Sequence, residues 1–188
     1  LKSKFKYVSA DKESEKEIDL SIDISDMHQI GDKTFDMLIA SDVLEHVYDD
    51  KKALNEIYRV LKIDGVAILT VPQPDKLEKT IEDLSEISEL ERIEKFGQAD
   101  HLRLYGSDFK EFLEKANFSV KIFDENSASS AEKNKYVLAP PVKSLDPLVT
   151  NHRKIYYAYK NQQDYKIGTF KKSIEEKTKY WFVVNCIN

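Results

Sequence analysis

Short apolar runs and amphipathic stretches alternate in the first half of the chain. Residues 37–40 form an apolar run bounded by Asp36 and Ser41, a pattern typical of a strand buried on both faces. Apolar side chains then recur at helical spacing over residues 51–61, and residues 66–71 form a second apolar run. Strand, polar loop, helix, turn and strand in this order predict a βαβ unit, and therefore a parallel sheet covered by helices.

The ends of this unit carry recognisable turn residues. Asp49 or Asp50 can cap the helix by accepting a hydrogen bond from an N–H group of its first turn. Gly65 is predicted to end the helix with a positive φ, and Pro72 stops the second strand. Ligands of parallel sheets bind at the carboxyl ends of the strands, so the polar residues among 41–46 are candidates for a binding site.

The rest of the chain shows similar but weaker patterns. Strands are predicted at residues 4–10, 18–22, 118–123 and 155–159, and helices at residues 76–95, 107–116 and 170–179. Asn117 stands where a helix commonly ends in glycine, and we expect it to adopt a left-handed conformation. The apolar run at residues 180–187 suits a strand that is buried on both faces.

Composition narrows the class of protein. Of the 188 residues, 41% are hydrophobic and 34% are charged, as in a soluble globular domain. The net charge of -5 predicts no binding to nucleic acid or to an anionic membrane, and no apolar run approaches the ~20 residues that span a bilayer. The single Cys186 excludes an internal disulfide framework, and we expect a cytoplasmic protein. We expect one domain at residues 1–160, with a helix and a strand from residues 161–188 packed on it.

Four short motifs are specific enough to suggest a family. They are Phe35-Asp36, Ser-Asp-Val-Leu-Glu-His-Val at residues 41–47, Arg-Val-Leu-Lys at residues 59–62, and Val71-Pro72. Together they resemble class I S-adenosylmethionine-dependent methyltransferases, most closely the subgroup that contains the ubiquinone-biosynthesis O-methyltransferases. The resemblance implies a three-layer α/β fold with a Rossmann-like sheet, mostly parallel with an antiparallel edge strand. It also implies S-adenosylmethionine as the cofactor and a small molecule as the methyl acceptor.

The same resemblance gives cofactor-binding roles to residues at strand ends. Asp11 matches the acidic residue that binds the ribose hydroxyls, a role that suits a carboxylate because both of its oxygens accept hydrogen bonds. Asp23 and Ile24 match the turn that binds adenine, although a register slip would put Asp26 in place of Asp23. The alternative is that these aspartates are solvated strand ends or turn caps.

The loop after residues 37–40 holds the next candidates. Ser41 and Asp42 complete the predicted cofactor-binding set, and His46 is a candidate general base because the pKa of histidine is near neutral. In the ubiquinone O-methyltransferases Glu-x-x-Glu-His binds a divalent metal here, and this chain has Asp42-x-x-Glu45-His46. Two carboxylates and an imidazole suit such an ion. The alternative, that these side chains pack or cap the loop, is favoured, and we expect no bound metal.

A second polar segment lies at residues 96–106. His101, Arg103 and Tyr105 alternate there, so an extended chain would place them on one side and the intervening leucines on the other. A similar segment occurs in a subset of the resembled enzymes, and we expect the three side chains to face the acceptor as base, cation and phenol. The alternative is a strand that Arg103 holds in place by pairing with Asp100 or a neighbouring carboxylate.

One part of the resembled fold is missing, because the sequence has no Gly-x-Gly. In the family a glycine-rich loop follows the central first strand and holds the methionine end of the cofactor. Either that strand and loop lie upstream of Leu1, or another segment replaces the strand. The spare apolar run at residues 180–187 is the candidate, as in a circular permutation, whereas the alternative is an added edge strand beside residues 155–159. Without the loop we expect weak cofactor binding or none.

Two other functions remain as alternatives. The missing loop would also suit a methyltransferase-like module that binds a partner without catalysis. A nucleotide-binding reductase of the Rossmann type is disfavoured, because Gly-x-Gly-x-x-Gly is absent and residues 42–47 do not suit that class.

Overall fold

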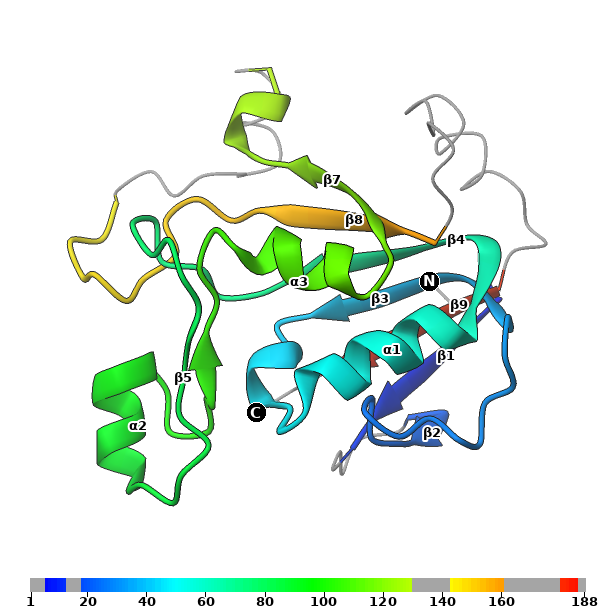
Figure 1. Cartoon of the computed structure of the whole chain (residues 1–188), viewed down its shortest axis with the longest axis horizontal. Helices are drawn as coiled ribbons and strands as arrows, with labels where there is room; N and C mark the ends of the chain where they lie inside the picture. The colour runs from blue at the N-terminus through cyan, green and yellow to red at the C-terminus, as the bar shows by residue number, and fades with distance from the viewer. Residues whose placement is uncertain (1–5, 13–17, 130–142, 161–179, 186–188) are drawn as a thin grey trace.

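A seven-stranded sheet forms the centre of the protein (Figure 1). The computed structural model describes residues 6–12, 18–129, 143–160 and 180–185. The strands, in chain order, are β1 (Lys6–Asp11), β2 (Leu20–Ser21), β3 (Phe35–Ser41), β4 (Leu61–Thr70), β7 (Ser119–Phe123), β8 (Ile155–Tyr159) and β9 (Tyr180–Asn185). Their spatial order is β2-β1-β9-β3-β4-β8-β7, and β8 runs antiparallel to both of its neighbours. The expected mostly parallel sheet is confirmed, with the antiparallel strand next to one edge.

Helices lie on one face of this sheet and beyond the carboxyl ends of its parallel strands. In Figure 1, α1 (Asp50–Val60) and α3 (Phe109–Lys115) cover the same face. A two-stranded sheet of β5 (Ile81–Glu82) and β6 (Arg103–Leu104) stands with α2 (Glu89–Phe96) beyond the strand ends. Two single turns complete the elements, η1 (Leu44–His46) and η2 (Glu125–Ser127).

Strand β9 occupies the central position of the sheet. It pairs in parallel with β1 on one side and with β3 on the other, so that Val183 is registered with both Ser9 and Ile39. The hypothesis that residues 180–187 replace the first strand is therefore confirmed for residues 180–185, and an edge position is excluded. The helix expected at residues 170–179 lies outside the described residues.

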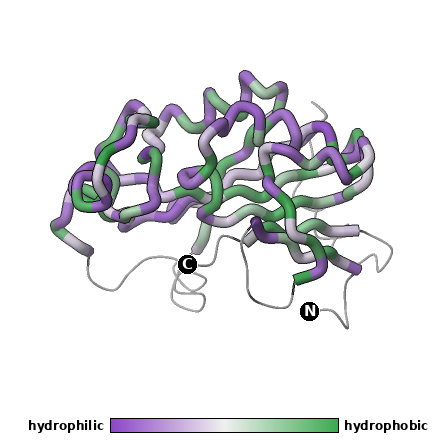
Figure 2. Tube along the Cα trace, turned by 90° about the horizontal axis from the view of Figure 1, so that it is seen from below, coloured by the Kyte–Doolittle hydropathy of each residue, from purple (hydrophilic) through white to green (hydrophobic). Residues whose placement is uncertain are grey.

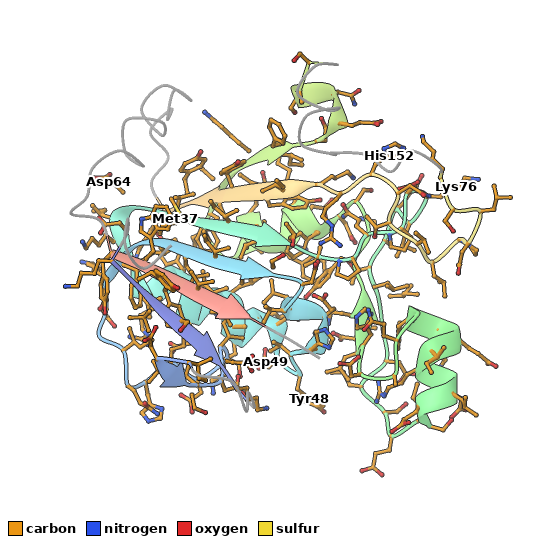
Figure 3. All side chains as sticks on the ribbon, turned by 180° about the vertical axis from the view of Figure 1, so that it is seen from behind. Met37, Tyr48, Asp49, Asp64, Lys76 and His152 are labelled. Atoms are coloured by element: carbon orange, nitrogen blue, oxygen red, sulfur yellow. The ribbon has the colours of Figure 1, made fainter. Side chains whose placement is uncertain are left out.

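Burial explains why an unbroken apolar segment occupies this position. Side chains alternate between the two faces of a strand, and among the described residues the helix side of β9 is buried while the other side is partly buried. Phe182 and Val184 face the helix side, where Phe182 stacks on Phe35 with ring centroids 4.7 Å apart. Trp181 packs with Met37 in a second cluster on the other face, which Figure 3 views directly. In Figure 2 the hydrophobic colour accordingly concentrates along the strands.

The turns around α1 confirm one prediction and contradict another. The Asp49 side chain accepts a hydrogen bond from the Lys52 N–H, so Asp49 is the helix N-cap. Gly65 does not end the helix, because α1 stops at Val60 and Gly65 lies within β4 without a positive φ. Glycine is needed there because the backbone of Lys62 lies close to it. A Cβ at position 65 would lie 2.9 Å from the Lys62 carbonyl oxygen. Asn117 has the expected left-handed conformation, with φ 68°.

The long helix expected at residues 76–95 is wrong, because only Glu89–Phe96 is helical. Asp83 interrupts it: its carboxylate accepts hydrogen bonds from the N–H and hydroxyl groups of Ser85, and such local bonds compete with helix formation. Ser88 and Glu91 then form a capping box that starts α2, and Gly97 ends it with φ 84°. The charged segment thus becomes a strand followed by a short helix.

Candidate functional site

Three predicted residues line one pocket at the carboxyl edge of the sheet. Asp11 ends β1 and is 7% exposed, whereas Asp23 and Ile24 follow β2. The pocket has a volume of about 170 Å³, and Val184 of the central strand also lines it. That volume is below the roughly 300–1,000 Å³ of complete small-molecule sites, so the pocket can hold only part of a larger ligand.

Asp23 is held in a tight turn inside this pocket. Its Oδ1 accepts hydrogen bonds from the N–H and the hydroxyl of Ser25, and its Oδ2 lies 3.1 Å from the Lys12 Nζ. Burial works against the charged carboxylate, but the bonds to Ser25 and Lys12 outweigh it and lower the pKa of Asp23. The turn-capping alternative therefore describes the geometry correctly, and it leaves Asp23 as a lining residue of the pocket.

Ser41 and Asp42 lie at the end of β3 and interact with β4. The Ser41 and Thr70 hydroxyls are 2.8 Å apart, and the Thr70 hydroxyl also donates to Asp42 over 3.3 Å. Asp42 has a φ of 53°, an uncommon conformation for a residue with a side chain. Its carboxylate binds the guanidinium of Arg153. Asp42 consequently lines a different pocket from Asp11.

This second pocket has a volume of about 420 Å³ and adjoins the first. Polar side chains from distant parts of the sequence line it, namely Asp42, Glu45, His46, Gln98, His101, Asp146, Thr150 and Arg153. His46 lines both pockets, so the two pockets are neighbours that share this residue.

Glu45 is the most strongly perturbed group of the second pocket. It is 1% exposed, and neither carboxylate oxygen has a hydrogen-bond partner among the described residues. Burial raises the pKa of Glu45 to about 8, and the nearby charge of Asp42 adds to the effect. Glu45 is thus mostly a neutral acid at pH 7, which suits a functional group more than a surface carboxylate.

Two histidines lie against Glu45. The rings of His46 and His101 meet edge to face with centroids 4.8 Å apart. Burial lowers the pKa of His101, and the neighbouring His46 adds to this shift. The Nδ1 of His101 lies 3.2 Å from the Phe96 carbonyl oxygen, and the Nδ1 of His46 lies 3.1 Å from a carboxylate oxygen of Asp100.

Arg103 does not face the second pocket, and this corrects a prediction. It is 0% exposed, and its guanidinium donates to the carbonyl oxygens of Leu44 over 2.8 Å and Tyr48 over 3.1 Å. It also donates to the Val47 carbonyl oxygen and to the carboxylate of Glu82. The alternative of a strand held by Arg103 pairing with a neighbouring carboxylate is therefore confirmed, with Glu82 and Asp50 as the carboxylates in place of Asp100.

Tyr105 is directed inwards as well. Its hydroxyl donates to the Asp50 carboxylate over 2.9 Å, and the ring is 0% exposed. Burial raises the pKa of Tyr105, and the charge of Asp50 adds to this. Of the three alternating residues, only His101 lines the second pocket, together with Leu104, which was expected to face away. The expected grouping of the three side chains on one side is therefore wrong, because the hydrogen-bonding groups of Arg103 and Tyr105 are bound in the protein interior.

Sequence reasoning missed Arg153 and did not predict the burial of Glu45, and both residues line the second pocket. Arg153, which binds Asp42 across 111 positions of sequence, lies just before β8 and belongs to no motif. Glu45 was weighed only as a metal ligand, and its burial depends on the β5–α2–β6 segment, where Leu102 N–H donates to the Glu45 carbonyl oxygen. Neither feature leaves a local signal in the sequence.

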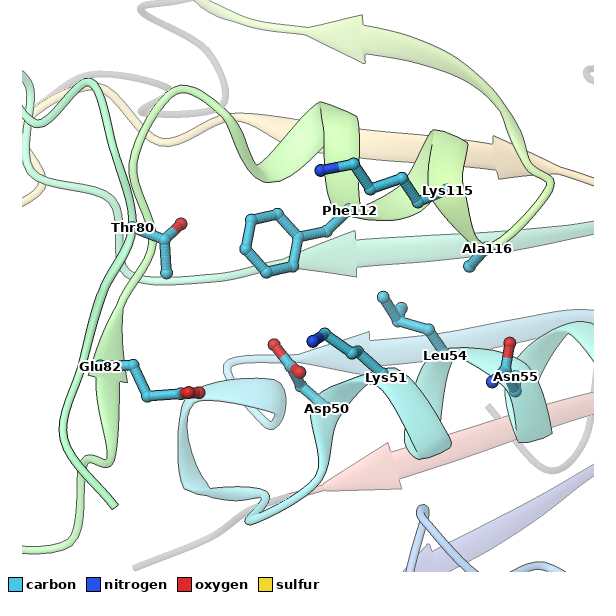
Figure 4. Close-up of a pocket in the computed structure, with 9 residues that line it drawn as sticks. All are labelled: Asp50, Lys51, Leu54, Asn55, Thr80, Glu82, Phe112, Lys115 and Ala116. Carbon is cyan, nitrogen blue, oxygen red and sulfur yellow. The ribbon is translucent and has the colours of Figure 1, made fainter. Parts of the chain in front are cut away.

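A third pocket lies between α1 and α3, on the helix-covered face of the sheet (Figure 4). Its volume is about 500 Å³, and Leu54, Phe112 and Ala116 supply its apolar surface. Of its acidic residues, Asp50 binds Tyr105 and Glu82 binds Arg103. Both carboxylates are already bound to buried side chains, so they are less available to a ligand than the polar groups of the second pocket.

The comparisons with known proteins agree with this geometry. Residues 3–69 match the family described as a methyltransferase domain, a stretch that carries β1 to β4 and with them Asp11, Asp42 and His46. This match covers about a third of the chain, and it agrees with the resemblance to class I S-adenosylmethionine-dependent methyltransferases. No curated protein sequence matches the chain.

Several solved structures share part of the arrangement. The chain is 19% identical to phosphoethanolamine N-methyltransferase 2 of Haemonchus contortus, with a TM-score of 0.41, covering 71% of this chain and 35% of that one. It is 16% identical to 1,6-didemethyltoxoflavin-N1-methyltransferase of Burkholderia thailandensis, with a TM-score of 0.46, covering 76% of this chain and 50% of that one. It is 20% identical to an S-adenosylmethionine-dependent methyltransferase of Thermotoga maritima, with a TM-score of 0.44, covering 75% of this chain and 63% of that one. The chain thus spans less than two thirds of each of these proteins, and at these scores the family assignment rests on residues 3–69.

The family cofactor, S-adenosylmethionine, fits this site in part. The first pocket has the carboxylates and the apolar side chains that a nucleoside requires, with Asp11 and Asp23 as acceptors and Ile24 beside them. For the methionine end, the sequence has no Gly-x-Gly of the kind that holds it in the resembled family.

Proposed function

We propose that the protein binds S-adenosylmethionine in the first pocket and transfers its methyl group to a small molecule in the second. The observation that carries the proposal is the position of His46, which lines both pockets. Asp11 would accept from the ribose hydroxyls, and Asp23 and Ile24 would contact adenine. Ser41 and Asp42 would then lie toward the transferred group, at the end of β3.

The protein's contribution to such a reaction is positioning and proton removal. Bound S-adenosylmethionine supplies an electrophilic methyl group on a sulfonium, and S-adenosylhomocysteine is the leaving thioether. Holding the acceptor in line with that methyl group removes much of the entropic cost of a bimolecular step. The imidazole of His46 can accept the proton that an oxygen or nitrogen acceptor loses. His101, kept neutral by burial, is the second candidate base in the same pocket.

The walls of the second pocket give it polarity suited to a small polar acceptor. Arg153 and Asp42 form an ion pair on one side, and Glu45 adds a neutral acid on the other. Phe96 and Leu104 of the β5–α2–β6 segment supply apolar surface and limit the access of water. Exclusion of water strengthens the electrostatic interactions inside a site and favours methyl transfer over competing reactions.

Calorimetric titration with S-adenosylhomocysteine tests the proposal directly. We expect binding with one molecule per chain, weaker than in relatives with a glycine-rich loop, and loss of most of it in Asp11→Ala. Asp26→Ala is the matched control, because Asp26 is an exposed aspartate of the neighbouring turn and does not line the pocket. Absence of binding at millimolar ligand would contradict the proposal.

The alternative function is a methyltransferase-like module that binds a partner and carries out no chemistry. The absence of Gly-x-Gly from the sequence favours it. The same titration separates the two functions, since a module without cofactor would give no heat with S-adenosylhomocysteine in the wild-type chain.

A further inference from the structure

Glu45, His46 and His101 form a compact cluster of potential metal ligands. One ligand atom from each residue lies within 4.8 Å of the others, and the His46 Nε2 is 3.9 Å from the Glu45 Oε1. Ligand atoms bound at about 2.1 Å to one tetrahedral ion lie roughly 3.4 Å apart. The largest separation would have to shrink by about 1.4 Å, shared between side chains, which small torsional changes supply.

His101 is oriented as metal-binding histidines usually are. In such sites the second ring nitrogen faces a carbonyl or carboxylate oxygen, which fixes the tautomer and leaves the other nitrogen for the ion. The His101 Nδ1 faces the Phe96 carbonyl oxygen at 3.2 Å, which leaves its Nε2 for an ion. The His46 Nδ1 lies 3.1 Å from the Asp100 carboxylate, a charge contact without hydrogen-bond geometry, and the His46 Nε2 is the nitrogen that lies toward Glu45.

Glu45 supplies the second, independent observation. Its carboxyl group is 1% exposed, and neither oxygen has a hydrogen-bond partner among the described residues. A buried carboxyl group in that state is costly unless it is paired, hydrogen-bonded or bound to a metal. A divalent cation would remove the cost, because it both neutralises the carboxylate and occupies its oxygens.

We propose that Glu45, His46 and His101 bind a divalent cation of the zinc type, with its open side toward the second pocket. Two imidazoles and one carboxylate are a frequent ligand set of zinc sites that keep one position for solvent or substrate. All three residues line that pocket. This set differs from the Asp42, Glu45 and His46 set considered from the sequence, because Asp42 is bound by Arg153 and His101 takes its place.

The cation would change the roles given to the histidines in the proposed function. With an ion bound, His46 and His101 act as ligands, and the ion in place of an imidazole promotes proton loss from the acceptor. This consequence rests on the proposed function, whereas binding of the cation does not. Cation binding is therefore measured without S-adenosylmethionine or an acceptor.

The experiment is titration of the chelator-treated protein with zinc chloride, by calorimetry, and with cobalt chloride, by visible absorption. We expect one ion per chain, a Co²⁺ spectrum of low-symmetry nitrogen and oxygen ligation, and a higher melting temperature with Zn²⁺. Glu45→Gln and His101→Asn should each weaken binding at least about 100-fold, and Asp100→Asn about 10- to 100-fold. Circular dichroism checks that each variant is folded, and Glu45→Gln keeps the size of the buried side chain.

Matched controls identify other binding sites. The other two of the four histidines, His28 and His152, lie elsewhere and pair with Asp26 and Glu125. His28→Ala, His152→Ala and Cys186→Ser should bind Zn²⁺ as the wild type does. The proposal is overturned if the wild type binds no ion, or if Glu45→Gln and His101→Asn keep wild-type affinity. Loss of Zn²⁺ binding with intact binding of S-adenosylhomocysteine would reject the cation and leave the proposed function standing.

Discussion

The Arg103 guanidinium lies 2.8 Å from the carbonyl oxygen of Leu44, a residue 59 positions earlier in the chain. This bond and its neighbours to Val47 and Tyr48 attach the β5–α2–β6 segment to the loop that carries His46. Arg103 thus positions the site without contacting a ligand.

Replacing Arg103 with Met should lower the free energy of unfolding of the protein. The change leaves Asp50 and Glu82 without their buried cation and removes the Arg103 donor from three carbonyl groups. Breaking a buried ion pair in this way costs about 3–5 kcal/mol in the free energy of unfolding, measured by urea denaturation. Lys110→Met is the control, because its exposed pair with Glu114 contributes less than about 0.5 kcal/mol. Equal urea midpoints for both variants would contradict the structural role of Arg103.

Replacing Phe182 with Ala tests the central position of β9. Phe182 is 0% exposed and stacks on Phe35, so the cavity should lower the free energy of unfolding by about 3–5 kcal/mol. Ile122→Ala on the edge strand β7 is the comparison. Ile122 is 39% exposed, so this variant should lose much less stability. Similar small losses of stability in both variants would contradict the central position of β9.

Replacing Asp11 with Ala should weaken the binding of S-adenosylhomocysteine without unfolding the chain. Loss of one acceptor for a polar group of a ligand costs about 1–3 kcal/mol, roughly 5- to 150-fold in the dissociation constant. Calorimetric titration gives the affinity, and the melting temperature shows whether the fold is intact. Unchanged affinity would remove Asp11 from the cofactor site.

The stability of the protein should fall in acid partly through Glu56. The hydrogen bond from Arg59, together with the N–H of Met27, lowers the pKa of Glu56 below the value of an unfolded chain. A carboxylate with a lowered folded pKa stabilises the fold above its unfolded pKa, and that stabilisation is lost as the pH falls through the folded pKa.

The measurement is urea unfolding between pH 6 and pH 3 for the wild type and Glu56→Gln. We expect a smaller loss of stability on acidification in the variant, because glutamine does not titrate. Glu114→Gln is the control, since that carboxylate is half-exposed and has only the pair with Lys110. A variant that loses as much stability in acid as the wild type would exclude a role for this carboxylate.

Local rules predicted much of the sheet correctly. The apolar runs at residues 66–71 and 155–159 lie in β4 and β8, and Asp49 and Asn117 take the expected cap conformations. These predictions succeeded because burial, capping and left-handed turns depend on a few neighbouring residues. They failed at residues 76–95, where side chains of Asp83 and Ser85 compete with the helix.

The alternation of His101, Arg103 and Tyr105 shows where local rules reach their limit. The sequence correctly predicted a short extended segment, but it could not predict what lay on each side of it. The carbonyl groups of Leu44 and Tyr48 compete for Arg103, and the carboxylate of Asp50 competes for Tyr105. Only the placement of β6 over η1 decides that competition.

The sequence by itself determined the strands, their apolar content and the polar residues at their ends, since these follow from the periodicity of neighbouring side chains. It also predicted that an unbroken apolar segment must be buried on both faces. The tertiary structure decided which strands flank that segment, and it placed β9 between β1 and β3. It alone brought His101 and Arg153 to the loop of Asp42 and His46, because contacts across many tens of residues depend on how the chain folds back and leave no local pattern.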